Sequence, residues 1–141
     1  MKIHPYINFQ GNARDAVLFY ADVFGAEPPR IMTYGDMPAG PGGKKDESLK
    51  DKVMHAGLMV HGNHLFFSDV PPGTPFQAGG SITLLVESKD AGELKQWFQR
   101  MKEGGTVIMD IQETFWSKCY GYVTDKFGVG WQFNLDSGES A

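Results

Sequence analysis

The sequence predicts an α+β fold built from two tandem βαβββ modules that form a cupped mixed sheet. Two observations support this fold class. One order of elements, a strand, a helix and then three strands, occurs in residues 1–70 and again in residues 80–136. A stretch rich in proline and glycine, residues 71–79, separates the repeats and is typical of a linker. The 141 residues suit a single domain, 1–141, that contains both modules.

The first module begins with a strand over residues 3–9, a segment rich in residues that favour strands. Apolar side chains recur every three or four residues over 16–24, which predicts a helix packed on a sheet. Asn12 is suited to cap the start of this helix, and Gly25 is suited to end it. Residues 31–34 suggest a second short strand.

Residues 35–52 form the longest irregular stretch of the chain. They are dominated by glycine, proline and charged residues, and they show no apolar period. Such a long loop in a small domain is either a mobile lid or simply disordered. We slightly favour the lid, and we expect the segment to be mobile in the free protein.

A hairpin is predicted over residues 53–70. If Gly62 and Asn63 form a two-residue turn, counting by twos places His55 and Phe66 on the same face of the sheet. A three-residue loop would change this register.

The second module repeats the pattern of the first. Its strand over residues 81–86 precedes a helix that Ser88 or Asp90 caps and that Gly104 and Gly105 close. Three strands follow, over residues 106–111, 118–124 and 130–135.

Composition limits the classes of function. The net charge of −4 provides no basic surface, so nucleic acid is not an expected partner. The first residues lack the apolar run of a signal peptide and no stretch is apolar enough to span a bilayer, so we expect a cytoplasmic protein without a membrane partner. The single cysteine, Cys119, cannot form an internal disulfide, and we interpret it as a small buried apolar residue.

Several short segments resemble the PhnB-like branch of the vicinal oxygen chelate superfamily, which includes glyoxalase I, extradiol dioxygenases, and the fosfomycin and bleomycin resistance proteins. The segments that carry this resemblance are 5–13 (PYINFQGNA), 35–38 (GDMP), 53–56 (VMHA), 114–116 (TFW) and 124–131 (TDKFGVGW). The resemblance covers the chain from about residue 3 to residue 134. It implies eight strands curled around a central site.

The resemblance also implies four slots for ligands of a divalent metal, one on the first and one on the last strand of each module. The first slot falls on Pro5, or on His4 if a one-residue gap is allowed. The other three fall on Phe66, Ser81 and Gln132. Phenylalanine cannot bind a metal, serine is a poor ligand and glutamine only a fair one. We therefore expect no metal and no other cofactor.

His55 is a candidate functional residue, because histidine gains or loses a proton near neutral pH. The alternative is a histidine hydrogen-bonded within the structure. Trp116 and Tyr122 suit the wall of a pocket equally well as a core. Trp131 and Phe133 are interpreted as core residues.

The remaining histidines, His4, His61 and His64, are interpreted as surface residues. We expect His55, Trp116 and Tyr122 to line one cavity with Phe66 and Gln132 at its floor. The predicted ligand-binding residues are His55, Phe66, Ser81, Trp116, Tyr122 and Gln132.

The predicted function is binding of an aromatic or amphipathic small molecule without a metal, as in the bleomycin-sequestering relatives, by a homodimer. The alternative is a metal-dependent lyase, isomerase or thiol transferase in which His4, His55 and Gln132 form an unusual site. A third possibility is an interaction module that uses its exposed edge strands. The branch is also described as a demethylubiquinone methyltransferase, but no glycine-rich loop that could hold a methyl donor follows a strand.

Overall fold

The computed structural model describes residues 1–38 and 47–138. The chain divides into two compact units, Met1–Phe76 (unit 1) and Gln77–Ala141 (unit 2), and the division falls inside the predicted linker. Among the described residues, no helix is both long and apolar enough to cross a membrane. The two units are described separately below.

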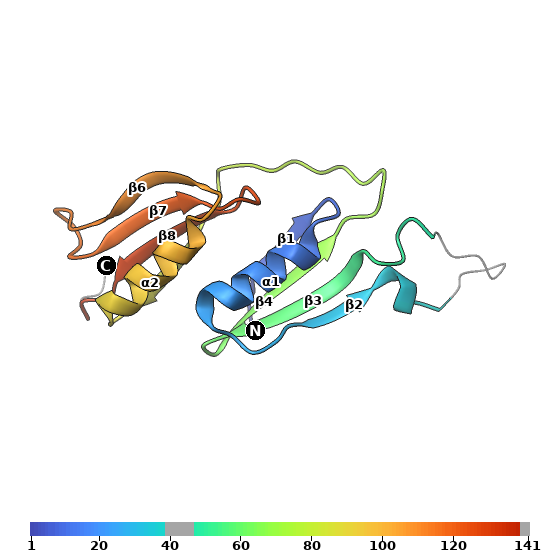
Figure 1. Cartoon of the computed structure of the whole chain (residues 1–141), viewed down its shortest axis with the longest axis horizontal. Coiled ribbons are helices and arrows are strands. Elements are labelled where there is room, and N and C mark those ends of the chain that lie inside the picture. The colour runs from blue at the N-terminus through green and yellow to red at the C-terminus, as the bar shows by residue number, and fades with distance from the viewer. Residues whose placement is uncertain (39–46, 139–141) are drawn as a thin grey trace. The chain divides into compact units, whose positions relative to one another are not determined.

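Unit 1 is a four-stranded mixed sheet with one helix on one face (Figure 1). Its elements are β1 (Tyr6–Phe9), α1 (Ala13–Phe24), β2 (Arg30–Thr33), the 3₁₀ helix η1 (Tyr34–Asp36), β3 (Val53–Val60) and β4 (Asn63–Asp69). The strand order is β1-β4-β3-β2. β1 and β4 are parallel, and the other neighbours are antiparallel. The predicted βαβββ order is confirmed.

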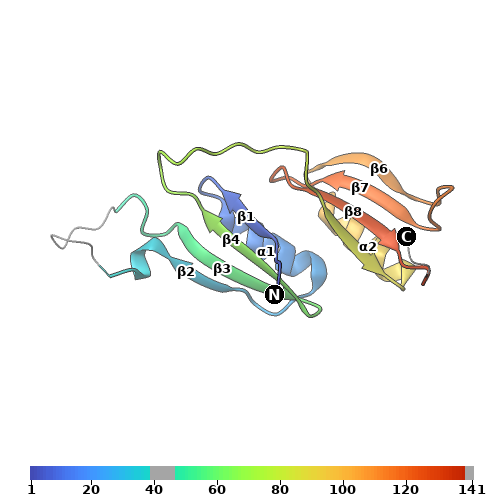
Figure 2. The same ribbon diagram turned by 180° about the vertical axis from the view of Figure 1, so that it is seen from behind.

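The core of unit 1 lies between α1 and the sheet. Val17, Tyr20 and Val23 of α1 are fully buried. Tyr20 stacks on Phe67 of β4 with 5.8 Å between the ring centroids. Because side chains alternate along a strand, the residues of β3 and β4 that lie between the core residues point to the side of the sheet away from α1. We call that side, which neither α1 nor η1 of the described residues covers, the outer face of unit 1 (Figure 2).

The start of α1 differs from the prediction. Asn12 occupies the N-cap position, but its side chain makes no capping hydrogen bond. The buried carboxylate of Asp69 instead accepts hydrogen bonds from the backbone N–H groups of Gly11 and Ala13, at 2.7 and 3.0 Å, and from that of Val53 at 2.9 Å. A negative charge is favourable at this end of a helix, so a residue distant in the sequence replaces the local cap.

The β3–β4 turn also requires a correction. Its two central residues are His61 and Gly62, with φ of 46° and 85°, and Asn63 already belongs to β4. Positive φ at both positions is the type I′ geometry, which matches the twist of a hairpin. The shift changes the pairing register by two residues, so the alternation of faces is unchanged. The prediction that His55 and Phe66 share a face is therefore confirmed.

The predicted loop over residues 35–52 is ordered at both ends. η1 occupies its start, and the backbone N–H groups of Tyr34 and Gly35 donate to the carbonyls of Lys52 and Lys50, both at 3.0 Å. The centre of the loop, residues 39–46, lies outside the described residues, so the lid stays a prediction.

Unit 2 repeats the architecture of unit 1. Its elements are β5 (Leu84–Ser88), α2 (Ala91–Met101), β6 (Thr106–Gln112), β7 (Tyr120–Thr124) and β8 (Gly130–Leu135), with strand order β5-β8-β7-β6. Asp90 is the N-cap of α2, and its side chain accepts from the N–H of Glu93 at 3.2 Å. β5 begins three residues later than predicted, at Leu84, where its pairing with β8 begins.

The core of unit 2 lies between α2 and its sheet. Phe98 of α2 meets Phe133 of β8 edge to face, with 5.7 Å between the ring centroids. Trp131 is buried on the same side, and its indole N–H donates to the buried Asp125 at 2.9 Å. These contacts confirm Trp131 and Phe133 as core residues. Cys119 is also buried, as predicted.

Candidate functional site

An aromatic cluster occupies the outer face of unit 1. The half-buried ring of Phe66 is its centre. The rings around Phe66 are those of His4 (5.4 Å between centroids, edge-on), His55 (5.5 Å, stacked), His64 (5.7 Å, stacked) and Tyr6 (6.3 Å, stacked). All four surrounding side chains are exposed. We call these five residues the Phe66 cluster.

The pairing of the strands explains why the cluster forms. Tyr6 of β1 and Gly57 of β3 are the direct neighbours of Phe66 on either side. Gly57 has no side chain to cover the ring, and a Cβ atom added there would lie 3.5 Å from Cε1 of Phe66. The phenylalanine ring is therefore accessible from the outer face.

Tyr6 and His55 are linked by a hydrogen bond. The hydroxyl oxygen of Tyr6 lies 3.1 Å from Nδ1 of His55. A neutral imidazole can accept the phenol proton at Nδ1, and a protonated imidazole can donate from Nδ1 to the phenol oxygen. The hydrogen bond can therefore form in either charge state of His55, and it does not involve Nε2 of that ring.

Three members of the cluster, His4, Tyr6 and His64, were not among the predicted ligand-binding residues. His4 and His64 were interpreted as surface side chains; both are exposed, yet their rings contact each other at 5.6 Å and contact Phe66 as well. His64 could have been predicted from the alternation of strand side chains, because it is two residues before Phe66 and so lies on the same face. His4 lies beside Phe66 through its side chain, whereas Pro5 contributes a carbonyl that accepts from the N–H of Phe66 at 3.1 Å.

On the face of the unit 2 sheet opposite α2, Gln132 of β8 is held by hydrogen bonds on both sides. Its Oε1 accepts a hydrogen bond from the hydroxyl of Tyr120 at 2.5 Å, and its Nε2 donates to Oγ1 of Thr83 at 2.9 Å. Burial raises the pKa of the Tyr120 phenol above its usual value, and the neighbouring Tyr122 raises it further. The fixed amide presents a polar centre among aromatic rings. Thr83, rather than the predicted Ser81, contacts Gln132.

A pocket of about 350 Å³ opens beside these residues in unit 2. Tyr122 contributes to its wall. The lining residues are Ala78, Gly79, Gly80, Ile82, Thr83, Tyr122, Thr124, Gly128 and Gly130. Four glycines expose peptide groups rather than side chains, and Gly130 is needed because a Cβ there would lie 2.8 Å from Cγ2 of Thr83.

Trp116 lies in the loop between β6 and β7. Its side chain is 53% exposed, which removes the core interpretation. The indole ring meets Tyr120 edge to face at 5.4 Å, and the ring of Phe115, 98% exposed, at 4.8 Å. Of the predicted site residues, His55 and Phe66 thus meet in unit 1. In unit 2, the ring of Trp116 contacts Tyr120, and the hydroxyl of Tyr120 donates to Gln132. Ser81 is exposed and lies before the start of β5.

The residues in three of the four metal slots do not fit a divalent ion. Phe66 presents hydrocarbon, and both polar atoms of the Gln132 amide already have hydrogen-bond partners. Within the described part of the chain, Ser81 makes no hydrogen bond with Gln132, whose amide donates to Thr83 instead. Within residues 1–38 and 47–138, no three His, Cys, Asp or Glu side chains are placed to hold one ion.

The fold and these motifs define a protein of the glyoxalase and bleomycin resistance class. A family model described as 3-demethylubiquinone-9 3-methyltransferase matches residues 1–134, and the chain belongs to this PhnB-like family. The protein YjdN of Escherichia coli is 34% identical over 143 residues, which cover 96% of this chain and 95% of YjdN.

Solved structures agree with this assignment. Protein PA1353 from Pseudomonas aeruginosa has a TM-score of 0.85 and 32% identity, with 96% of this chain and 98% of that chain covered. The PhnB protein from Bacillus cereus, described as a putative 3-demethylubiquinone-9 3-methyltransferase, has a TM-score of 0.72 and 26% identity, with 96% and 100% covered. FosX of Listeria monocytogenes, solved with Mn(II) and a phosphonic acid, shares the fold alone, at a TM-score of 0.63 and 12% identity over 97% of this chain and 92% of that chain.

Proposed function

We propose that this chain is a small-molecule-binding protein that holds an aromatic or amphipathic ligand without a metal ion. The observation that carries the proposal is the Phe66 cluster. An accessible phenylalanine ring, bordered by exposed rings and by a few hydrogen-bonding groups, lies on the sheet face opposite α1. Aromatic walls with a small number of polar groups are typical of small-molecule sites.

Unit 2 supports the same proposal with different residues. Its pocket combines apolar surface from Tyr122 and Ile82 with a hydroxyl from Thr83. The amide of Gln132 beside it is fixed by two hydrogen bonds, so it is preorganised to orient a polar group of a ligand.

The name of the family describes a methyl transfer, which requires a methyl donor. Donor-binding folds commonly hold an anionic or polar cofactor at a glycine-rich helix start. At the start of α1, the backbone N–H groups of Gly11 and Ala13 are already bound to the Asp69 carboxylate. Binding of a small molecule is therefore the function that the residues favour over methyl transfer.

A metal-dependent lyase, isomerase or thiol transferase is the second candidate. What favours it is that His4 and His55 both lie against Phe66, which occupies one of the four metal slots that the resemblance implies. Elemental analysis of protein purified without chelator separates the two candidates. One zinc, nickel, manganese or iron per chain would support the enzyme, and the binding proposal expects far less than one.

Fluorescence of N-phenyl-1-naphthylamine, an uncharged aromatic probe, tests the binding function. We expect Phe66→Ala to raise the dissociation constant by about tenfold, because it removes the central ring. Gly57→Val should weaken binding as well, since a branched side chain would cover that ring without entering the core. Far-UV circular dichroism checks that both variants fold.

Leu18→Ala is the matched control for this experiment. Leu18 is 48% exposed on α1, so its loss removes apolar surface outside the outer face. Unchanged binding in the folded Phe66→Ala and Gly57→Val variants would contradict the proposal. Displacement of the probe by S-adenosylmethionine at micromolar concentration would instead favour the methyltransferase.

A further inference from the structure

We propose that the pocket of unit 2 is a second ligand site, which takes a small uncharged carbonyl compound whose oxygen accepts a hydrogen bond from Thr83. The inference rests on the proposed binding function, and it adds a separate site and the chemical class of its ligand. It comes from the direction of the hydrogen bonds that lead to the pocket wall.

Three side chains of unit 2 form a chain of hydrogen bonds with one direction. The hydroxyl of Tyr120 donates to Oε1 of Gln132 at 2.5 Å, and Nε2 of Gln132 donates to Oγ1 of Thr83 at 2.9 Å. A side-chain amide has its acceptor on the oxygen and its donors on the nitrogen. Because Tyr120 occupies the oxygen, the amide turns its nitrogen toward Thr83. The Thr83 oxygen therefore accepts a hydrogen bond from the protein.

The hydroxyl hydrogen of Thr83 is left for a ligand. Within the described part of the chain, this hydroxyl donates to no protein acceptor. Thr83 is half-buried, and it lines the pocket. A hydroxyl that already accepts a hydrogen bond is a better donor, because hydrogen bonds in a chain polarise one another. The pocket wall thus presents a donor, and the complementary group of a ligand is an acceptor such as a carbonyl oxygen.

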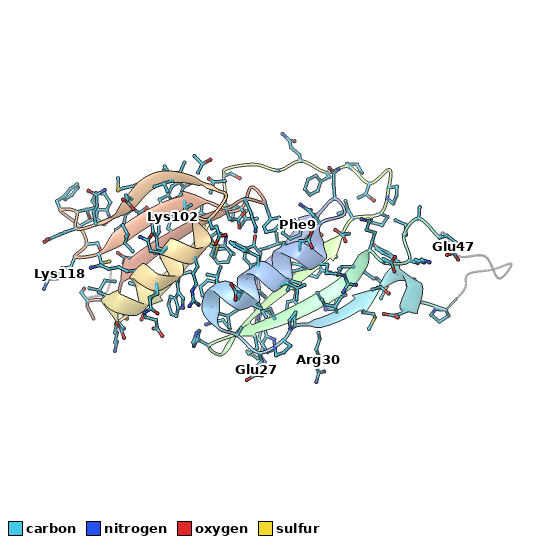
Figure 3. All side chains as sticks on the ribbon, in the orientation of Figure 1. Phe9, Glu27, Arg30, Glu47, Lys102 and Lys118 are labelled. Atoms are coloured by element: carbon cyan, nitrogen blue, oxygen red, sulfur yellow. The ribbon has the colours of Figure 1, made fainter. Side chains whose placement is uncertain are left out.

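Among the residues that the structure describes, no charged side chain lines the pocket. Lys102, at the end of α2, and Lys118, before β7, lie outside its wall (Figure 3). The Asp125 carboxylate of the β7–β8 turn is buried and accepts hydrogen bonds from the N–H groups of Phe127 and Val129. A charged ligand would lose hydration in the pocket without gaining an ion pair, so an uncharged ligand is favoured.

The rest of the wall suits a flat apolar body. Tyr122 and Ile82 contribute apolar surface to the pocket. Gly79 and Gly80 have no atom within 4 Å of their Cβ positions, so the space beside them is open. The volume of about 350 Å³ is small for a ligand pocket, which favours a compound of one or two rings.

Fluorescence of Prodan, an uncharged naphthalene ketone, tests this inference. Two reference compounds share its dimethylaminonaphthalene rings: one has no carbonyl group, and the other has a carboxylate in place of the ketone. All three are measured in Phe66→Ala, which removes the ring proposed to bind aromatic ligands in unit 1. We expect the ketone to bind roughly threefold or more tightly than either reference compound, because only the ketone is both uncharged and an acceptor for Thr83.

Thr83→Val, made in the same Phe66→Ala protein, removes the hydroxyl at nearly constant volume. The ketone should bind about three- to tenfold more weakly, the net contribution of a hydrogen bond between neutral groups. Binding of the compound without a carbonyl should not change. Thr83→Ser keeps the hydroxyl and should retain the affinity. Thr74→Val is the matched control, since Thr74 is exposed and lies outside the pocket wall. Far-UV circular dichroism checks that each variant folds.

The emission of bound Prodan reports the hydrogen bond itself. Prodan emits at longer wavelength when its carbonyl accepts a hydrogen bond, so Thr83→Val should shift the emission to shorter wavelength. Tyr120→Phe tests the direction of the chain, because without the phenol the Gln132 oxygen can turn and accept the Thr83 hydrogen. We expect this variant to weaken binding of the ketone alone, whereas a purely structural role of Tyr120 would affect the compound without a carbonyl equally.

The outcomes separate the two proposals. If neither Prodan nor N-phenyl-1-naphthylamine binds the wild-type protein, the proposed function itself fails. If both bind the wild type but Prodan does not bind Phe66→Ala, the second site is overturned while the binding function stands. The inference is also overturned if the carboxylate binds as tightly as the ketone, or if Thr74→Val has the same effect as Thr83→Val. Unchanged affinity and emission in Thr83→Val contradict it as well, and Tyr120→Phe decides if Thr83→Val does not fold.

Discussion

Phe66 determines the chemistry of the outer face of unit 1. A phenylalanine at this position offers a flat apolar surface, and the absence of a side chain at Gly57 keeps that surface open. The polar atoms nearby belong to Tyr6 and to imidazoles, which can act as donors or acceptors. At the scale of single residues, these groups are the basis of the proposed binding of an aromatic ligand.

The first prediction at this scale concerns the ionisation of the Tyr120 phenol. Burial, and secondarily Tyr122, raise the pKa of its phenol in the folded state. A raised pKa means that the folded state holds the proton more tightly than the unfolded state. The resulting stabilisation is present below about pH 10, the usual value of a tyrosine, and is lost as the pH rises through the folded-state pKa.

We therefore expect the free energy of unfolding to fall above pH 10, and to fall less steeply in Tyr120→Phe. In a titration followed at 295 nm, the same variant should lack one of the phenols that ionise late. Tyr6→Phe, which removes a phenol that is 48% exposed, is the control. An identical late phase in Tyr120→Phe would contradict the prediction.

At the scale of elements, each helix is held against its sheet by close packing. β7 approaches α2 closely at Gly121, where a Cβ atom would lie 2.8 Å from Cε2 of Phe98 and 3.2 Å from Cβ of Ile111. Phe98 is fully buried and also contacts Phe133, so it has little room to move. The glycine is thus required by the helix that covers the strand.

Gly121→Ala should destabilise unit 2. Overpacking of a well-packed core costs about 1–3 kcal/mol, and we expect a loss of that size in urea denaturation. Gly79→Ala is the control, because no atom lies within 4 Å of the Cβ position at Gly79. Equal stability of the two variants would show that α2 can shift away from β7 without cost.

At the scale of the whole molecule, we propose that the chain forms a homodimer. Large apolar side chains of unit 2 are exposed, including Ile82 (80%), Leu85 (56%) and Ile108 (57%). Exposed apolar surface of this kind often marks a contact with another protein chain. Symmetric dimers are the commonest oligomers, which makes a second copy the first partner to consider.

Light scattering checks the dimer directly. We expect a mass of twice the 15.6 kDa chain at micromolar concentration, and a shift toward the monomer in Ile108→Glu. Lys95→Glu, a change of charge at an exposed position of α2, is the control and should leave the mass unchanged. A wild-type mass of 15.6 kDa would contradict the proposal.

The sequence by itself determined the order of the elements, both core faces and the position of the linker. Apolar periodicity marks a helix or a strand because it depends on residues within a few positions of each other. The stripe of α1, the core residues Trp131 and Phe133, and the shared face of His55 and Phe66 were all predicted on this basis. The last of these held although the turn was misplaced, since a shift of two residues leaves the alternation of a strand intact.

The tertiary structure alone decided which distant residues meet. Asp69 replaces Asn12 as the acceptor at the start of α1, and His4 reaches Phe66 only because β1 pairs with β4. Thr83 contacts Gln132 for the same reason, through the pairing of β5 with β8. Parallel pairing joins segments about 50 to 60 residues apart, and no local pattern specifies which side chains it brings together.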